Sequence, residues 1–192
     1  MTNNANKIEQ WKINKRLNFI KGGKFANLQI QIWLVNKKNG KEKKLFIITR
    51  WLESTTKDWL PVFVKDKDSV DYHIMSMDLY EAYKYFSLVE VFFYNRYLSE
   101  KKVEDYFKDF FKWYKKTENN GIISFNVGII HKLENINKFI FLSYNFKKEN
   151  DELRFNGLTI QTKDKETTNK IVLDIFEANM IYKYVLHNML EF

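Results

Sequence analysis

Side chains that could bind a polyanion follow one another in the first third of the chain. Around Trp33 the residues alternate between apolar and polar, as in a half-buried strand, and Gln29, Gln31 and Trp33 fall on the polar side. A nucleic-acid base that stacks on an aromatic ring gains about 1–3 kcal/mol whatever its identity, and lysine or arginine can neutralise the phosphates. This segment therefore predicts a surface on which bases stack beside a cationic groove.

Arg50 and Trp51 lie on the next expected strand. Successive residues of a strand point to opposite faces, so only one of them can share the face of Trp33, and the sequence leaves open which one. The alternative is that these aromatic residues pack in the core or at an edge, as we expect of Phe139 and Phe141. The predicted nucleic-acid-binding residues are Lys21, Lys24, Gln29, Gln31, Trp33, Lys44, Arg50, Trp51 and Trp59, with Tyr144 and Arg154 as weaker equivalents in the second half.

The sequence holds no arrangement that is typical of a catalytic or metal site. Its three histidines, His73, His131 and His187, are scattered and have no carboxylate or second histidine at ligand spacing. It contains no cysteine for thiol chemistry or for zinc and iron–sulfur ligation. The glycines within residues 21–24 lack the Ser or Thr, and the spacing, of a phosphate-binding loop. We expect a protein that is not an enzyme and that uses no cofactor or metal.

The charge is distributed unevenly along the chain. The net charge is +8, and it divides into +9 for residues 1–68 and −1 for residues 69–192. A basic region of this kind is the expected footprint of a polyanionic partner. A lysine-rich surface that keeps the protein in solution is the alternative interpretation.

Nothing in the hydropathy of the chain indicates a membrane segment. No apolar run approaches the ~20 residues needed to span a bilayer, and residues 1–24 are polar and basic, without the apolar stretch of a secretory signal. We therefore expect no membrane partner and an intracellular location, either cytoplasmic or, in a eukaryote, in an organelle or nucleoid.

The elements that must position these residues follow the same order in both halves. Apolar alternation and turn residues predict four strands and then a long helix, with a hairpin turn at Asn39-Gly40. In the first half the strands are 28–35, 45–52, 59–65 and 72–77, and the helix begins at Leu79. In the second half they are 125–129, 139–146, 153–162 with a bulge at Gly157, and 170–176, and the helix begins at Glu177. Between the halves, Ser99 is expected to cap a further helix, and residues 115–120 to form a linker.

Two copies of this unit predict an α+β fold. The apolar face of the first helix, which includes Leu79, Phe86 and Phe92, is too wide to be buried by one small sheet. We therefore expect two ββββα repeats packed as an intramolecular pseudo-dimer, with two antiparallel four-stranded sheets. The expected organisation is a basic arm (1–24) and a single domain (25–192) made of repeat 1 (25–98), a connecting helix and linker (99–120) and repeat 2 (121–192).

This order of elements resembles the Whirly family of single-stranded-DNA-binding proteins, whose general fold is shared by PUR-repeat proteins and kinetoplastid mitochondrial RNA-binding proteins. The resemblance covers residues 17–192 by element order. Residues 21–28, KGGKFANL, resemble the family's motif of lysine, glycine, lysine, small residues and leucine on strand one, with an inserted glycine and a phenylalanine as departures. Residues 121–127 and 171–190 resemble the start and the end of the family's second half. The resemblance implies binding of single-stranded nucleic acid.

The sequence thus predicts a protein that binds single-stranded nucleic acid largely without regard to base sequence. DNA is favoured and RNA is the alternative, because no residue is identified that would contact the 2′-hydroxyl. A protein–protein interaction module, such as a phage- or plasmid-type inhibitor, is the competing hypothesis, since aromatic residues and arginine are also enriched in protein interfaces. The formation of a homo-oligomer is left open.

Overall fold

The computed structural model describes residues 11–15, 21–22, 26–37, 40–51, 72–133, 136–163 and 168–190. The strands are β1 (Trp11–Lys15), β2 (Lys21–Gly22), β3 (Ala26–Lys37), β4 (Gly40–Trp51), β5 (Tyr72–Asp78), β6 (Tyr97–Ser99), β7 (Lys115–Asn119), β8 (Ile122–Leu133), β9 (Ile136–Glu149), β10 (Glu152–Lys163) and β11 (Thr168–Leu173). The helices are α1 (Leu79–Tyr94), α2 (Glu100–Phe110) and α3 (Ile175–Leu190). The α+β class is therefore confirmed.

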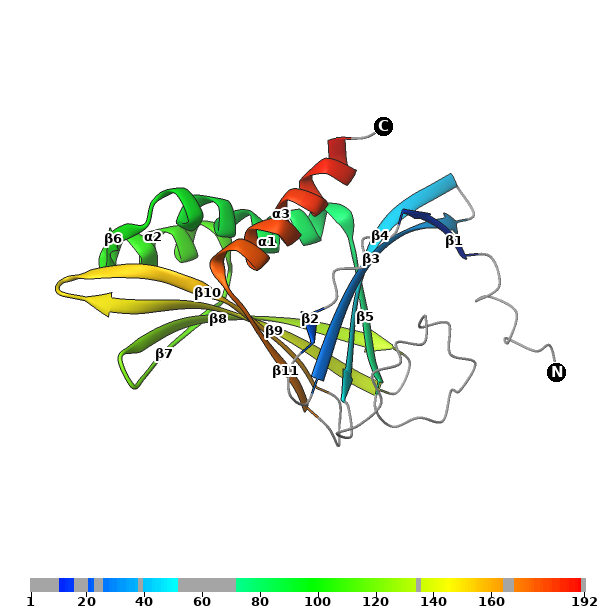
Figure 1. Ribbon diagram of the computed structural model, residues 1–192. Coiled ribbons are helices and arrows are strands. Elements are labelled where there is room, and N and C mark those ends of the chain that lie inside the picture. Colours follow the sequence, from blue (N-terminus) through cyan, green and yellow to red (C-terminus); the bar gives the residue numbers. More distant parts are fainter. Residues whose placement is uncertain are drawn as a thin grey trace.

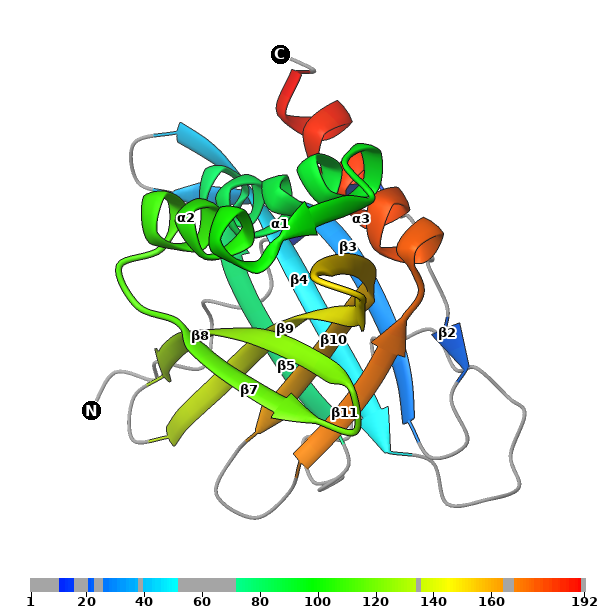
Figure 2. The ribbon, with the colours of Figure 1, turned by 90° about the vertical axis from the view of Figure 1, so that its left-hand side faces the viewer.

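The strands form two sheets in which every pairing is antiparallel, and these sheets have five and six strands, whereas four were expected in each. The first sheet has the order β1-β3-β4-β5, and β2 pairs with β3 near one end. The second has the order β11-β10-β9-β8-β7, and β6 pairs with the start of β10. The three helices lie along one side of the two sheets (Figures 1 and 2).

Each helix begins at a polar side chain that satisfies its first amide groups. Asp78 accepts a hydrogen bond from the Glu81 amide at 2.7 Å, and Ser99 accepts one from the Lys102 amide at 3.3 Å, as predicted for this cap. At α3, Asp174 Oδ1 accepts from the Glu177 amide at 2.9 Å while Glu177 Oε2 accepts from the Asp174 amide at 2.8 Å. This reciprocal pair is a capping box, and it fixes where β11 ends and α3 begins.

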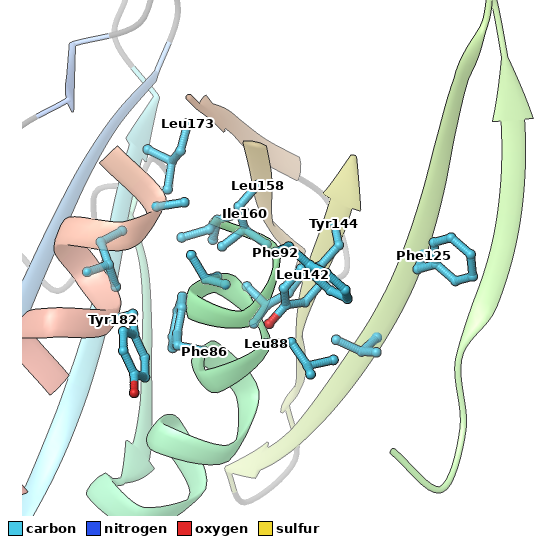
Figure 3. Packing of buried hydrophobic residues seen from close by; sticks show 14 of the residues in the cluster. Phe86, Leu88, Phe92, Phe125, Leu142, Tyr144, Leu158, Ile160, Leu173 and Tyr182 are labelled. Atoms are coloured by element: carbon cyan, nitrogen blue, oxygen red, sulfur yellow. The ribbon is translucent and has the colours of Figure 1, made fainter. Parts of the chain in front are cut away.

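The core of the described residues lies between α1 and the second sheet. Phe92 is 1 % exposed, and its ring lies 5.0 Å from that of Phe146 and 5.8 Å from that of Phe155. Tyr144 donates a hydrogen bond to the Tyr85 carbonyl of α1. Figure 3 shows side chains of the helix directed at the strands of this sheet. The second sheet therefore helps to bury the helix that follows the first sheet.

The helices α1 and α3 join the two halves through polar contacts as well. Glu90 of α1 accepts a hydrogen bond from the Tyr182 hydroxyl at 2.6 Å and forms an ion pair with Lys183, both on α3. These two donors hold the pKa of Glu90 below its ordinary value. Lys43 of β4 donates to the Asn188 carbonyl of α3 at 2.8 Å. Each half thus contacts the helix of the other.

A bulge interrupts β10 where the sequence predicts one. The register with β9 shifts between Phe155 and Gly157, and Gly157 has a φ of +130°. A Cβ at this position would lie 2.1 Å from the Leu173 carbonyl oxygen. Only glycine fits here, because both the dihedral angle and the approach of β11 exclude a side chain.

Several element boundaries differ from those expected. Residues 115–119, predicted as a linker, form the strand β7, which pairs with β8 across a turn at Asn120-Gly121. The predicted arm contains β1 and β2, both paired with β3. The last strand ends at Leu173 and not at Phe176, because Asp174 caps α3. The predicted strand 59–65 lies outside the described residues, and β4 pairs directly with β5.

Candidate nucleic-acid interface

The strand register brings several of the predicted residues to one face of the first sheet. Trp33 of β3 is paired with Lys44 of β4, and residues directly opposite each other in an antiparallel pair belong to the same face. Alternation along β3 adds Gln29 and Gln31 to that face. The pairing of Asn27 with Arg50 adds Arg50 in the same way. We call this face, opposite to the one that carries Leu45, Ile47 and Met77, the outer face of the first sheet.

The opposite face belongs to the core. Leu45 and Ile47 are fully buried and Met77 is 3 % exposed. Trp51 is paired with Ala26 and is placed by alternation on the face of Leu45 and Ile47. The choice that the sequence left open is thereby made by the register: Arg50, and not Trp51, shares the face of Trp33.

The remaining predicted residues of the first half are placed elsewhere. Lys21 is paired with Leu28, which puts it on the core-side face, at the edge formed by β2. Lys24 and Trp59 lie outside the described residues. The register therefore groups five of the predicted residues on the outer face, namely Gln29, Gln31, Trp33, Lys44 and Arg50.

Lys44 lies beside the start of α1. It is paired with Asp78, the N-cap residue of that helix. Burial, and then the negative charge of Asp78, raise the pKa of Glu81, whereas the positive charge of Lys44 acts to lower it. Lys44 therefore stands near two carboxyl groups, and part of its charge is offset. At the other end of β4, Arg50 is paired with Tyr72 of β5. This is a second pairing of a cationic with an aromatic residue, after that of Lys44 with Trp33.

Tyr144 is not part of such a surface. Its side chain is fully buried among aromatic rings of the core, and burial strongly raises the pKa of its hydroxyl. A base cannot stack on a ring that has no exposed face, so its assignment as a binding residue is wrong. Arg154 is partly exposed and pairs with Glu149 at 3.0 Å, at the far end of β10 from β11.

The outer face of the second sheet carries a row of hydrogen-bonded polar side chains. Ser143 donates to Asn126 at 2.5 Å, and Asn145 donates to Thr159 at 2.8 Å and accepts from Ser124 at 2.8 Å. These groups bind one another across β8, β9 and β10. Their donors and acceptors are largely engaged within the sheet, which leaves fewer of them for a ligand.

Aromatic residues adjoin this row. The rings of Phe139 and Phe141 are stacked at 6.1 Å with an interplanar angle of 12°, and both are half-buried on the outer face, whereas core positions were expected. Trp113 was not predicted as a site residue. It is 59 % exposed and lies close to Gly128, where a Cβ would be 3.8 Å from its ring. Lys112 precedes it and Lys115 and Lys116 follow shortly after, and these lysines are the feature of the sequence from which its exposure could have been predicted.

The described residues hold no group of three or more His, Asp or Glu side chains that could bind a metal ion. None of the helices described is long and apolar enough to cross a bilayer. Comparison of the chain with protein-family models, with curated proteins and with solved structures found no match.

Proposed function

We propose that this protein binds single-stranded nucleic acid through the outer face of its first sheet, with DNA as the favoured ligand and without catalysing a reaction. One observation carries the proposal: Trp33 and Lys44 are opposite each other in the register, on the face opposite to that of the buried Leu45 and Ile47. A stacking platform beside a cation is the pairing that a nucleotide requires.

The proposed division of labour follows from residue chemistry. A base stacks on Trp33, while Lys44 and Arg50 neutralise backbone phosphates on either side of it. The amide groups of Gln29 and Gln31 offer donors and acceptors without demanding one base. In a duplex the bases are stacked on one another and their faces are covered, so a platform of this kind favours a single strand. RNA would bind by the same contacts.

We also propose that the two halves are structural repeats arranged as a pseudo-dimer, as in Whirly-like folds. The support comes from strand order: β1, β3, β4 and β5 are neighbours in chain order and lead into α1, and β8 to β11 are neighbours in chain order and lead into α3. In this alignment the first repeat begins in the predicted arm, at β1. Contacts of each half with the helix of the other support an intertwined arrangement.

Fluorescence anisotropy with labelled oligo-dT, and with a duplex of the same length, tests the function. We expect the single strand to bind more tightly at physiological salt. Equal or tighter binding of the duplex would exclude the single-strand proposal. An RNA strand of matched length then measures the preference for DNA.

A tryptophan substitution tests the platform itself. Trp33→Ala should weaken oligo-dT binding by about 1–3 kcal/mol, the contribution of one stacked base. Trp113→Ala removes an exposed tryptophan from the segment between α2 and β7 and should leave the affinity unchanged. Circular dichroism establishes that both variants are folded. If folded Trp33→Ala binds like the wild type, β3 is not the platform.

Exposed apolar side chains on the helices favour one competing function, a protein interface. Tyr80 is 72 % exposed on α1, and Met180 and Leu190 are exposed on α3. Under this alternative the purified protein would bind no oligonucleotide even at low salt. Copurification of a stoichiometric protein partner, lost in Tyr80→Ala or Met180→Ala, would then support the interface.

A further inference from the structure

A pocket of about 320 Å³ opens where the end of α1 and the start of α3 meet above β10. It lies at the opposite end of α1 from Asp78, the residue paired with Lys44. The lining residues are Phe92, Phe93, Arg96, Arg154, Phe155, Asn156, Asp174, Ile175 and Phe176.

The pocket lies at a gap in the edge of the second sheet. On this side of β10, pairing with β6 ends at Arg154 and pairing with β11 begins at Leu158. The three residues between them have no strand neighbour on that edge among the described residues. The bulge also leaves Asn156 without a partner in the β9 register, and its side chain is exposed. The main-chain groups of residues 155–157 on that edge, and the side-chain amide of Asn156, are therefore not engaged in pairing with another described strand.

Aromatic side chains form the floor and one wall of the pocket. Phe92 and Phe155 are buried beneath it, at 1 % and 5 % exposure. Phe93 and Phe176 meet edge to face, with ring centroids 5.7 Å apart, and Phe176 is 59 % exposed. An exposed phenylalanine ring supported by a second ring offers a rigid face on which a planar group can stack.

The charged side chains that line the pocket differ in how far they are engaged with other described residues. Arg154 pairs with Glu149 at 3.0 Å, and Lys147 lies 3.7 Å from the same Glu149 oxygen. Asp174 accepts the amides of Phe176 and Glu177, so its charge is engaged at the start of α3. Arg96 is exposed and forms no ion pair or hydrogen bond with any side chain that the structure describes. Together, Arg96 and Arg154 offer planar donors suited to phosphate.

We propose that this pocket binds a single phosphorylated nucleotide, with the phosphate held by Arg96 and Arg154 and the base stacked on Phe176. The volume is at the lower end of the roughly 300–1,000 Å³ typical of small-ligand sites, which suits one nucleotide. The exposed amide of Asn156 faces the same space and can bind the base edge. A free mononucleotide and the phosphorylated end of a strand share this chemistry. The inference goes beyond the proposed function and stands without it.

Isothermal titration of the full chain with AMP, adenosine and inorganic phosphate tests the ligand class. We expect AMP to bind and each of the two parts to bind at least roughly tenfold more weakly, because each makes only one of the two kinds of contact. Binding of phosphate alone with the same affinity as AMP would overturn the assignment of a base site. No AMP binding at millimolar concentration, together with no preference for a phosphorylated strand end, would overturn the whole proposal.

Two substitutions at exposed positions locate the ligand without disturbing the core. Arg96→Gln should lower AMP affinity roughly tenfold or more, the loss expected for a hydrogen bond to a charged group, and Phe176→Ala should lower it by a similar factor. Lys101→Gln removes an exposed cation from α2, and Tyr80→Ala removes an exposed aromatic ring from α1; both are controls that should bind AMP like the wild type. AMP binding that is equal in all four folded variants would place the ligand elsewhere and overturn the proposal.

A pair of oligonucleotides separates the two sources of the ligand. If the site holds a strand end, a 5′- or 3′-phosphorylated oligo-dT binds more tightly than its unphosphorylated counterpart, and Arg96→Gln abolishes that difference. If it holds a free nucleotide, AMP binds and the two oligonucleotides do not differ. Binding of the unphosphorylated strand reports on Trp33 and the first sheet alone, so failure there counts against the proposed function and not against this pocket.

Discussion

Two inner strands, β4 in the first sheet and β10 in the second, show how differently the two sheets are built. β4 pairs with β3 along its whole length and with β5 from Lys44 to Arg50, with no shift of register in either pairing. β10 changes its neighbour from β6 to β11 along one edge and bulges at Gly157 opposite β9. An uninterrupted strand presents a continuous face, whereas an interrupted one opens a pocket.

Under the two proposals, this difference corresponds to two kinds of recognition in one chain. A continuous face with residues at regular spacing suits an extended polymer, and the outer face of the first sheet is of this kind. A gap of three residues at an edge suits one small group. On the second sheet the outer polar side chains bind one another, and the proposed ligand pocket lies at the gap.

A large effect is expected from Gly157→Ala, which changes the residue at which β10 is interrupted. The added methyl group would lie 2.1 Å from the Leu173 carbonyl oxygen at a φ of +130°, so we expect a loss of about 3 kcal/mol or more of unfolding free energy. Gly121→Ala is the control, since its φ is +74° and nothing lies within 4 Å; it should cost only about 1–2 kcal/mol. Urea denaturation measures both. Equal midpoints would contradict the close approach of β11.

The next effect concerns the helix that the two halves share. Phe92→Ala should destabilise the protein by about 3–5 kcal/mol, because the ring is 1 % exposed among rings of the second sheet. Tyr80→Ala, on the exposed side of the same helix, should change the stability by no more than about 0.5 kcal/mol. Similar losses in the two variants would mean that the second sheet does not bury α1.

The salt dependence of binding compares the two sheets directly. If Arg50 contacts a phosphate, Arg50→Gln should reduce the slope of log affinity against log salt by about 0.7 for a single strand. Lys170→Gln removes an exposed cation from β11 and should leave the slope unchanged. Anisotropy titrations at four salt concentrations give the slopes. Equal reductions would assign the binding to net charge and not to the first sheet.

The smallest effect tests the ion pair between the helices. Glu90 has a lowered pKa because Lys183 and Tyr182 donate to it, so its stabilising contribution is present above the ordinary value of 4.5 and is lost as the pH falls through the lowered pKa. The pair is partly exposed, so Glu90→Gln should cost at most about 1 kcal/mol at pH 7, and the difference from the wild type should shrink below pH 4.5. Glu118→Gln, exposed on β7, is the control. A difference that stays constant down to pH 3 would contradict this linkage.

Local chemistry made much of the fold predictable. The cap at Ser99, the hairpin of β3 and β4 and the bulge at Gly157 each depend on residues close together in the chain, and each is confirmed. The polar strand β7 was missed, because residues 115–119 are all exposed and carry no apolar alternation. Its pairing depends on β8, which comes later in the sequence.

The site was less predictable, because alternation along a strand assigns residues to a face of the sheet only when one residue of that strand is already known to be buried. In residues 139–142, FIFL, every side chain is apolar, so alternation cannot tell which residues enter the core, and Phe139 and Phe141 were placed there wrongly. Tyr144 is two residues after the buried Leu142 and therefore lies on the same, core-facing side of β9. Trp33 could be placed beside Lys44 only through the register of β3 with β4. The pocket is formed by α1, β10 and α3 together, and no local sequence pattern predicts that these three elements come into contact.

The burial of α1 by the second sheet also has a consequence for the order of events during synthesis. The ribosome completes α1 well before it reaches Phe146 and Phe155, whose rings cover Phe92. At about 5–20 residues per second, the apolar side of the helix waits several seconds for its partner. During that interval Phe92 has neither of these two rings to cover it. The contact of Phe92 with the second sheet, which stabilises the complete molecule, thus makes the burial of α1 depend on the synthesis of the second half.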